Sequence, residues 1–195
     1  MKANILLFLA LVPCLLFAQG REKLDTVNPI YNEFLPVIDG MITFSEVVQV
    51  DSLSKNDIFL RAHDWIIKTF NSAKDVIQFA DKDAGKIVCK TVTGATVGKG
   101  WNKVTIDPVF YLLTIEVRSG RYKITASNFV HEYSVGMGAM KTSGSNPLES
   151  YYLLASPTKK EYETNIAFAE IIAGNIQNIF DSAFDAISEV GDEEW

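Results

Sequence analysis

The sequence predicts an α+β domain in which two helices pack on one face of an antiparallel sheet of about five strands. Three patterns lead to this prediction: an amphipathic stripe over residues 58–70, alternating apolar residues over 109–117, and apolar residues at three- and four-residue steps over 162–187. The elements follow one another as strand, helix, four strands and helix. Because the helices are segregated from the run of strands, this order is typical of an α+β domain.

The first 18 residues predict a cleavable signal peptide. Lys2 is their only charged residue, an apolar run extends from Ile5 to Phe17, and Ala18 ends it before a polar segment. The run is shorter than the roughly 20 apolar residues that span a bilayer, and Pro13 interrupts it. We therefore expect an exported protein, periplasmic or extracellular, with no stable membrane insertion after cleavage. A retained anchor and a lipidated Cys14 are the alternatives.

Beyond the signal peptide at 1–18, the sequence predicts a lead-in segment and one domain. Residues 19–38 are the lead-in segment, because charges and prolines interrupt any periodicity there. Residues 39–190 form a single domain, which is long enough to bury a core of its own. We divide it into a core at 40–133, an irregular connection at 134–157 and a C-terminal helix at 158–190.

The chain is acidic, and this excludes some partners. Its formal net charge is −6, and cleavage after Ala18 would remove one Lys and no acid, which makes the charge −7. Nucleic acids and anionic lipids are bound mainly by Lys and Arg that neutralise phosphates. We therefore expect neither a nucleic acid nor an anionic lipid surface as a partner.

The first strand and the first helix follow a turn at Asp39-Gly40. Apolar and β-branched residues predict the strand over 42–50. Ser54 predicts the start of the helix, because its hydroxyl can accept from the third helical N–H, and the helix extends to about Phe70. The residues on its apolar arc, which spans about 140° and is expected to face the core, are Ile58, Phe59, Ala62, Trp65, Ile66, Thr69 and Phe70. The charged side, with Asp64 four residues before Lys68, is expected to face solvent.

Four further strands are predicted. A turn at 81–85 joins the strands at 76–80 and 87–93. A glycine-rich loop follows, and the two-residue turn Ser119-Gly120 then joins Val109–Arg118 to Arg121–Val130.

The two-residue turn predicts the register of this hairpin, because Arg118 has to pair with Arg121. The pairs that follow on the apolar face are Val117 with Tyr122, Ile115 with Ile124, and Leu113 with Ala126. The pairs on the other face are Glu116 with Lys123 and Thr114 with Thr125, both of which are favourable. Pattern and turn therefore agree on the register.

The same register places Phe110 opposite Phe129 on the polar face, with Leu112 beside them. Apolar side chains gathered on a polar face usually mark a surface that something covers. One interpretation is cover by the connection at 134–157, which carries Met137, Met140, Tyr151 and Tyr152. The other is a partner or a second copy of this chain. Phe110, Leu112 and Phe129 are therefore the candidate binding residues.

Several short runs of residues between roughly Gly40 and Tyr133, together with Pro36 to Asp39 before them, match a known pattern. These runs are Phe44–Val48, Ser54-Lys55, Arg61-Ala62, Trp65, Gly85–Ile87 and Gly120–Tyr122. These runs resemble a secreted bacterial family of unknown function whose fold is described as TATA-binding-protein-like. Cys89-Lys90 departs from the family pattern. The resemblance implies that fold and an exported setting, and it supplies no catalytic residue. Because a fold does not specify a function, DNA binding is not expected from the fold name.

No motif predicts a catalytic residue, a metal site or a cofactor. Cys89 lies in a strand-like run and is interpreted as a small buried hydrophobic residue. The run 94–100 has three residues between its first two glycines where a phosphate loop has four, so it is interpreted as a strand connection. His63 and His131 are the only histidines and lack the spacing of a zinc site.

We therefore expect a non-enzymatic binding or interaction module of the bacterial envelope, whose partner is a protein or a glycan. Self-association is an alternative use of the same surface. The alternative class is a secreted or periplasmic hydrolase that uses His131 with Glu132 or Glu116 as its acid and base. A structural protein that docks through its C-terminal helix is a third hypothesis.

Overall fold

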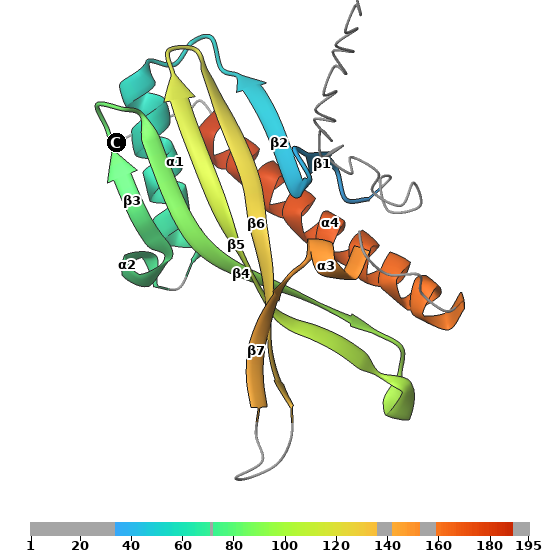
Figure 1. Cartoon of the computed structure of the whole chain (residues 1–195). Coiled ribbons are helices and arrows are strands. Elements are labelled where there is room, and N and C mark those ends of the chain that lie inside the picture. The colour runs from blue at the N-terminus through green and yellow to red at the C-terminus, as the bar shows by residue number, and fades with distance from the viewer. Residues whose placement is uncertain (1–33, 71, 136–141, 153–158, 189–195) are drawn as a thin grey trace, which may run out of the picture.

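The structure is a computed structural model that describes residues 34–70, 72–135, 142–152 and 159–188. The predicted signal peptide lies outside the described residues. Figure 1 shows a twisted antiparallel sheet with two helices behind it. The strands are β1 Val37–Ile38, β2 Met41–Gln49, β3 Ile77–Asp81, β4 Lys86–Val97, β5 Val104–Arg118, β6 Arg121–Val135 and β7 Thr142–Pro147. The helices are α1 Lys55–Thr69, α2 Ala73–Val76, the 3-10 turn η1 Gly100–Asn102, α3 Glu149–Tyr152 and α4 Lys159–Ser188.

The sheet confirms the α+β prediction and corrects its strand number. The strand order is β1-β2-β6-β5-β4-β3, with β7 paired to the far part of β6, so the sheet has seven strands where about five were expected. The extra strands are β1, which is two residues long, and β7, which carries no apolar alternation.

Helix α1 forms as predicted because its first turn is capped. The Asp57 backbone N–H donates to Ser54 Oγ at 3.2 Å, and Ser54 Oγ donates to the Asp57 carboxylate at 2.6 Å. This second bond lowers the pKa of Asp57. The buried residues of the helix are Ile58, Phe59, Ala62, Trp65 and Ile66. Thr69, expected on the same arc, is exposed, because the chain leaves the helix at Phe70.

The hairpin of β5 and β6 has the predicted register from the turn as far as Leu113. The observed pairs are Arg118–Arg121, Val117–Tyr122, Glu116–Lys123, Ile115–Ile124, Thr114–Thr125 and Leu113–Ala126. Val117, Ile115 and Leu113 are buried together with their partners in the core. Gly120 has φ 73°, the left-handed conformation that the tight turn requires.

Beyond Leu113 the prediction that Phe110 lies opposite Phe129 is wrong. Leu112 pairs with Ser127, but Phe110 pairs with Val130, so β6 has one residue more than β5 over this stretch. The extra residue forms a β-bulge at Asn128, which has φ 56°. Because of this extra residue, each side chain that follows in β6 points to the face of the sheet opposite the predicted one. Phe129 therefore points into the core, where it is fully buried and stacks on Tyr111 at 5.2 Å between ring centroids.

The irregular connection expected at 134–157 is also corrected. β6 continues to Val135, and β7 pairs with it from Thr142 to Pro147. Helix α3 follows, and Leu148 before it is fully buried. The remaining residues of that connection, 136–141 and 153–158, which include Met137 and Met140, lie outside the described residues. The loop expected at 94–100 is likewise partly strand, because β4 extends to Val97.

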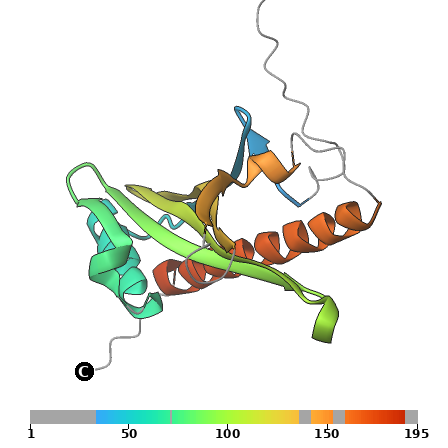
Figure 2. The ribbon, with the colours of Figure 1, turned by 60° about the horizontal axis from the view of Figure 1, so that its bottom comes forward.

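The sheet divides into two ribbons at its lower end. β4 and β5 stay paired up to the η1 turn, while β6 leaves β5 after His131 and pairs with β7. Figures 1 and 2 show the two ribbons diverging, with α4 running along the back of the sheet.

Helix α4, predicted at 158–190, belongs to the domain core. Its buried residues are Phe168, Ala169, Ile172, Ile176, Phe180, Ala183 and Ile187. Polar contacts also fix it. Asn175 Nδ2 donates to Thr93 Oγ1 and to the Gly94 carbonyl, both at 3.1 Å, and Arg61 donates to the Ile187 carbonyl at 3.1 Å. An apolar stripe that is buried in this way is not free to dock a separate structural partner. A search of the described helices found none that is long and apolar enough to span a bilayer.

Trp65→Ala should lower the free energy of unfolding by about 3–5 kcal/mol, because it leaves a cavity between α1 and α4. Trp65 is 3% exposed, its indole N–H donates to Ser182 Oγ at 3.1 Å, and its ring contacts Phe70. Urea denaturation measures the change. Leu60→Ala on the same helix, where Leu60 is 51% exposed, is the control and should cost less than about 1 kcal/mol. An equally small loss for Trp65→Ala would contradict this packing.

Candidate functional site

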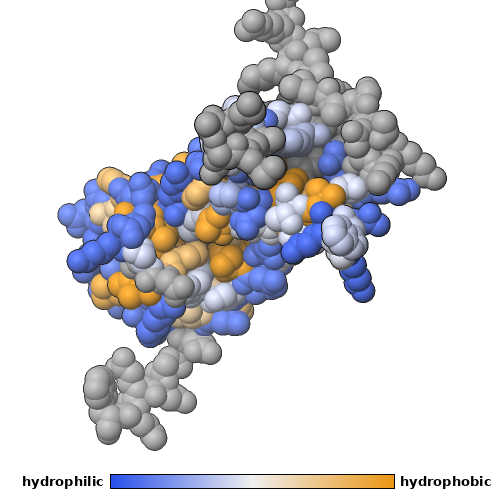
Figure 3. Space-filling model, turned by 90° about the horizontal axis from the view of Figure 1, so that it is seen from below, coloured by the Kyte–Doolittle hydropathy of each residue, from blue (hydrophilic) through white to orange (hydrophobic). Residues whose placement is uncertain are grey.

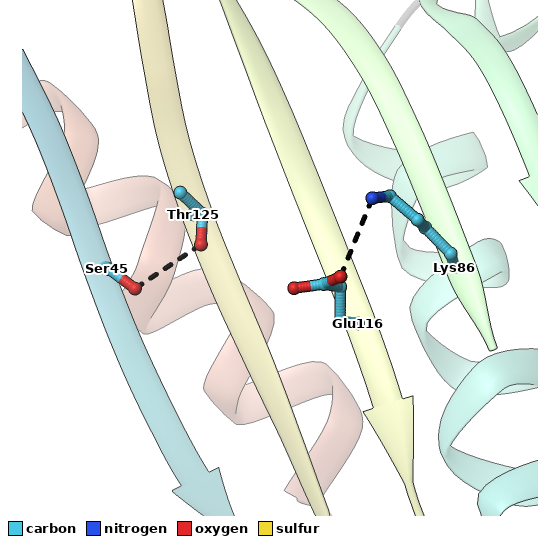
Figure 4. A network of polar contacts seen from close by, with 4 residues as sticks. All are labelled: Ser45, Lys86, Glu116 and Thr125. Atoms are coloured by element: carbon cyan, nitrogen blue, oxygen red, sulfur yellow. Dashed lines mark hydrogen bonds and ion pairs between the residues drawn. The ribbon is translucent and has the colours of Figure 1, made fainter. Parts of the chain in front are cut away.

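The face of the sheet opposite α1 and α4 carries no described helix, and we call it the outer face. Its side chains change in character along β5 and β6, from apolar near the bulge to cationic near the Ser119-Gly120 turn. Between the two ends lies a polar belt. Figure 4 shows this belt from the outer face with the helices behind: Ser45 and Thr125 share a hydrogen bond at 3.3 Å, and next to them Lys86 pairs with Glu116 of the cationic end at 3.6 Å.

The apolar end of the outer face is a patch of Val92, Phe110, Leu112 and Val130, which we call the apolar patch. Val92 pairs with Phe110 across β4 and β5, and Phe110 pairs with Val130 across β5 and β6, so the three form one row. Val92 is 54% exposed and the other three are half-buried. A shallow hollow of about 150 Å³ lies at this row. Two of the three candidate binding residues, Phe110 and Leu112, are therefore on the outer face, and Phe129 is not.

One cation belongs to the apolar patch. Lys90 Nζ lies 4.6 Å from the centroid of the Phe110 ring, a cation–π contact. Lys90 takes part in neither ion pair found among the described residues, which are Asp64–Lys68 and Lys86–Glu116. The patch thus offers an apolar row and an ammonium group together.

The described part of the 134–157 segment does not cover the apolar patch. Tyr151 packs against the core, and its hydroxyl lies 3.0 Å from His131 Nδ1. His131 and Val130 are neighbours in β6, so their side chains point to opposite faces. The cover expected from Tyr151 is therefore wrong, while Met137 and Met140 stay untested because they lie outside the described residues. The side chain of Tyr152 is likewise not described.

Apolar groups also reach the surface elsewhere, as Figure 3 shows for the molecule seen from below. Trp101 at the η1 turn is fully exposed, and Val104 beside it is 50% exposed. Sequence reasoning missed this turn because it interpreted the whole run 94–100 as a connecting loop. A tryptophan directly after a glycine-rich run is the sequence signal that the loop interpretation did not use.

The cationic end of the outer face is a cleft of about 640 Å³, which we call the cationic cleft. Its basic lining residues are Lys55, Lys86, Arg118, Arg121 and Lys123, and its acidic lining residue is Glu116. The sequence correctly predicted that Arg118 pairs with Arg121, but it predicted no binding site at this pair.

His131 does not meet either carboxylate that the hydrolase hypothesis requires. Glu132 is its neighbour in β6 and so lies on the other face. Glu116 is seven residues along β5 from Val109, the partner of His131, which is roughly 23 Å away. Instead His131 contacts the rings of Tyr133 and Tyr151, and Asn146 donates to the same Tyr151 hydroxyl at 3.4 Å.

The surroundings of His131 disfavour the charged form of its imidazole. Burial lowers the pKa of His131, and the Asp107 carboxylate partly opposes this change. A cleft of about 610 Å³ lies beside it between the two ribbons, lined by Asp107, Pro108, Glu132, Tyr133, Ser134, Ser143, Gly144 and Ser145. The hydrogen bond between His131 Nδ1 and the Tyr151 hydroxyl ties β6 to α3, which is a structural role.

The remaining reactive groups serve packing. Cys89 is 1% exposed on the core face of β4, as predicted, and burial raises its pKa to about 12. His63 stacks on Phe59 of the same helix at 6.4 Å between ring centroids. Within the described residues, no three His, Cys, Asp or Glu side chains are grouped as a metal ion would require.

The thiol of Cys89 should be unreactive in the folded protein. A pKa of about 12 against an ordinary 9.0 lowers the thiolate fraction at pH 8 about a thousandfold. Iodoacetamide should therefore label Cys89 slowly in buffer and rapidly in urea, and peptide mass spectrometry separates Cys89 from Cys14. Equal labelling under both conditions would show that β4 does not bury this residue.

Comparison with known proteins supports the fold. Residues 44–132 match the family described as "Domain of unknown function (DUF4468) with TBP-like fold". No curated protein matches the chain.

Two solved structures are similar to this chain. A TBP-like protein from Parabacteroides distasonis ATCC 8503 has 19% identity and a TM-score of 0.55, with 78% of this chain and 98% of that chain covered. A DUF4468 family protein from Bacteroides ovatus ATCC 8483 has 17% identity and a TM-score of 0.62, with 83% and 94% covered. At these identities the likeness shows the fold alone. The resemblance found in the sequence is confirmed: residues 44–132 match this family, and the fold of the chain is TBP-like.

Proposed function

We propose that this protein is an exported, non-enzymatic binding module that captures a protein partner on the apolar patch of its outer face. The observation that carries the proposal is the row of Val92, Phe110 and Val130, which lies on the face of the sheet that no described helix covers. On the other face of the sheet, which α1 and α4 cover, a row of apolar side chains like this one would be buried. An uncovered row of apolar side chains with a polar surround is typical of an interaction site.

The chemistry of the patch favours a protein partner over a glycan. Three of its four residues are aliphatic, and aliphatic side chains gain most from contact with other apolar side chains. The Lys90 ammonium beside them, which has no carboxylate partner among the described residues, would pair with an Asp or Glu of the partner. We therefore expect a segment that presents apolar residues next to an acidic one.

The hydrolase alternative gains no support from the described contacts. His131 bonds to Tyr151, and neither Glu116 nor Glu132 reaches it. A general acid or base has to lie within hydrogen-bond distance of the group it serves. The apolar patch therefore carries the argument for function.

Phe110→Glu should weaken partner binding and leave the fold intact, because the side chain is on the outer face and half-buried. The partner is first identified by cross-linking from the patch in the envelope fraction, then purified and titrated by calorimetry. Phe110→Glu should weaken its affinity by about tenfold or more, the usual effect at the centre of an interface.

Ile67→Glu, on the exposed side of α1 where Ile67 is 48% exposed, is the matched control and should bind as the wild type does. Equal affinities for Phe110→Glu and the wild type would reject the patch. Binding to a glycan, or a dimer that Phe110→Glu dissociates in sedimentation, would replace the protein partner by that occupant.

Export rests on residues 1–18 and has its own test. Expression of the full chain in a bacterial host should yield a mature protein that begins at Gln19 and is recovered outside the cytoplasm. Intact-mass analysis of the purified protein reads the N-terminus directly. A chain that keeps Met1 and fractionates with the cytoplasm would refute export without affecting the apolar patch.

A further inference from the structure

The cationic cleft concentrates positive charge on an acidic protein. It gathers five basic side chains and one acid, whereas the whole chain has a formal net charge of −6. Four of the basic residues come from the sheet, and Lys55 comes from the first turn of α1. The cleft therefore has the opposite sign from the protein that carries it.

The register of the hairpin accounts for this concentration. Arg118 pairs directly with Arg121, and in the next row of the same face Lys86 and Lys123 lie on either side of Glu116. Like charges directly opposite each other destabilise a sheet. Neither arginine has an ion-pair partner among the described residues.

Lys55 is held in place at the edge of the cleft. Its Nζ donates to the Asp83 carbonyl at 2.6 Å, and its stem crosses Gly85. A Cβ at Gly85 would lie 2.5 Å from Lys55 Cε and 2.6 Å from the Val117 carbonyl oxygen, so a side chain here would displace the Lys55 stem. Gly85 also has φ +69°, which disfavours other residues. The ammonium is thus pre-positioned beside the hairpin.

These observations define the ligand that fits. A pair of guanidinium groups presents planar forks that match the oxygens of a phosphate, and flanking ammonium groups add charge. A compact anion contacts the cleft alone, whereas an extended polyanion would also contact other parts of a chain whose formal net charge is −6. We propose that the cationic cleft binds a compact phosphate-bearing anion, at a site separate from the apolar patch.

The test is a titration of the full chain with pyrophosphate, followed by amide chemical shifts. Shifts should concentrate on residues that line the cleft, and the affinity should fall about tenfold for Arg121→Gln and further when Arg118→Gln is added. Lys74→Gln, on α2, removes the same charge elsewhere and should leave the affinity unchanged. Equal weakening by Lys74→Gln, or equal shifts from sodium chloride at matched ionic strength, would overturn the proposal.

Two further measurements separate the outcomes. Because Arg121 faces Arg118, Arg121→Gln should raise the unfolding temperature without phosphate, so that lost binding cannot be ascribed to misfolding. Phe110→Glu should bind pyrophosphate as the wild type does, which keeps this test independent of the proposed partner.

Sedimentation with vesicles identifies the source of the phosphate. Binding to phosphatidylglycerol vesicles but not to phosphatidylcholine alone, lost in the double Arg variant, would assign the site to a lipid headgroup. Pyrophosphate binding without vesicle binding would assign it to a soluble phosphorylated compound. Absence of both kinds of binding would refute the site.

Discussion

The pairing of β5 with β6 is the constraint on which the rest of this structure depends. These strands lie in the middle of the sheet, and their register decides which side chains face α1 and α4 and which face outward. From the turn to Leu113 the register buries an unbroken apolar row. A shift by one residue would bring Arg118 and Glu116 into the core, where charges without partners are too costly to bury. Burial therefore admits a single register.

The bulge at Asn128 changes the pairing of β5 with β6, and so changes which residues of β6 face the core. By inserting one residue it moves Phe129 into the core and leaves Val130 on the outer face beside Phe110. It also precedes the point where β6 leaves β5 for β7. One residue in the left-handed region thus completes the core at Tyr111, shapes the apolar patch and leads into the division into two ribbons.

The outer face has two chemically distinct ends on one rigid support. Phe110 and Arg118 are eight residues apart along β5, roughly 26 Å, with the polar belt of Ser45 and Thr125 between them. At that distance the charge of the cationic cleft is screened from the apolar patch at physiological salt. Ligands bound at the two ends of this face would therefore not compete.

The sequence by itself determined the elements whose signals are local. The Ser54 cap, the apolar arc of α1 and the turn at Ser119-Gly120 each depend on residues close together in the chain. The cap and the turn formed as predicted, and the arc did so except at Thr69, which is exposed. The family resemblance fixed the fold. Only the tertiary structure decided the bulge, because Asn128 gives no signal until its partner strand is known. Strand β7 was also visible only in the tertiary structure, because it is an exposed edge strand whose pairing needs no apolar alternation. The tertiary structure also assembled the cationic cleft, since Lys55, Lys86 and the two arginines come from segments that meet only when distant strands pair and α1 packs beside them.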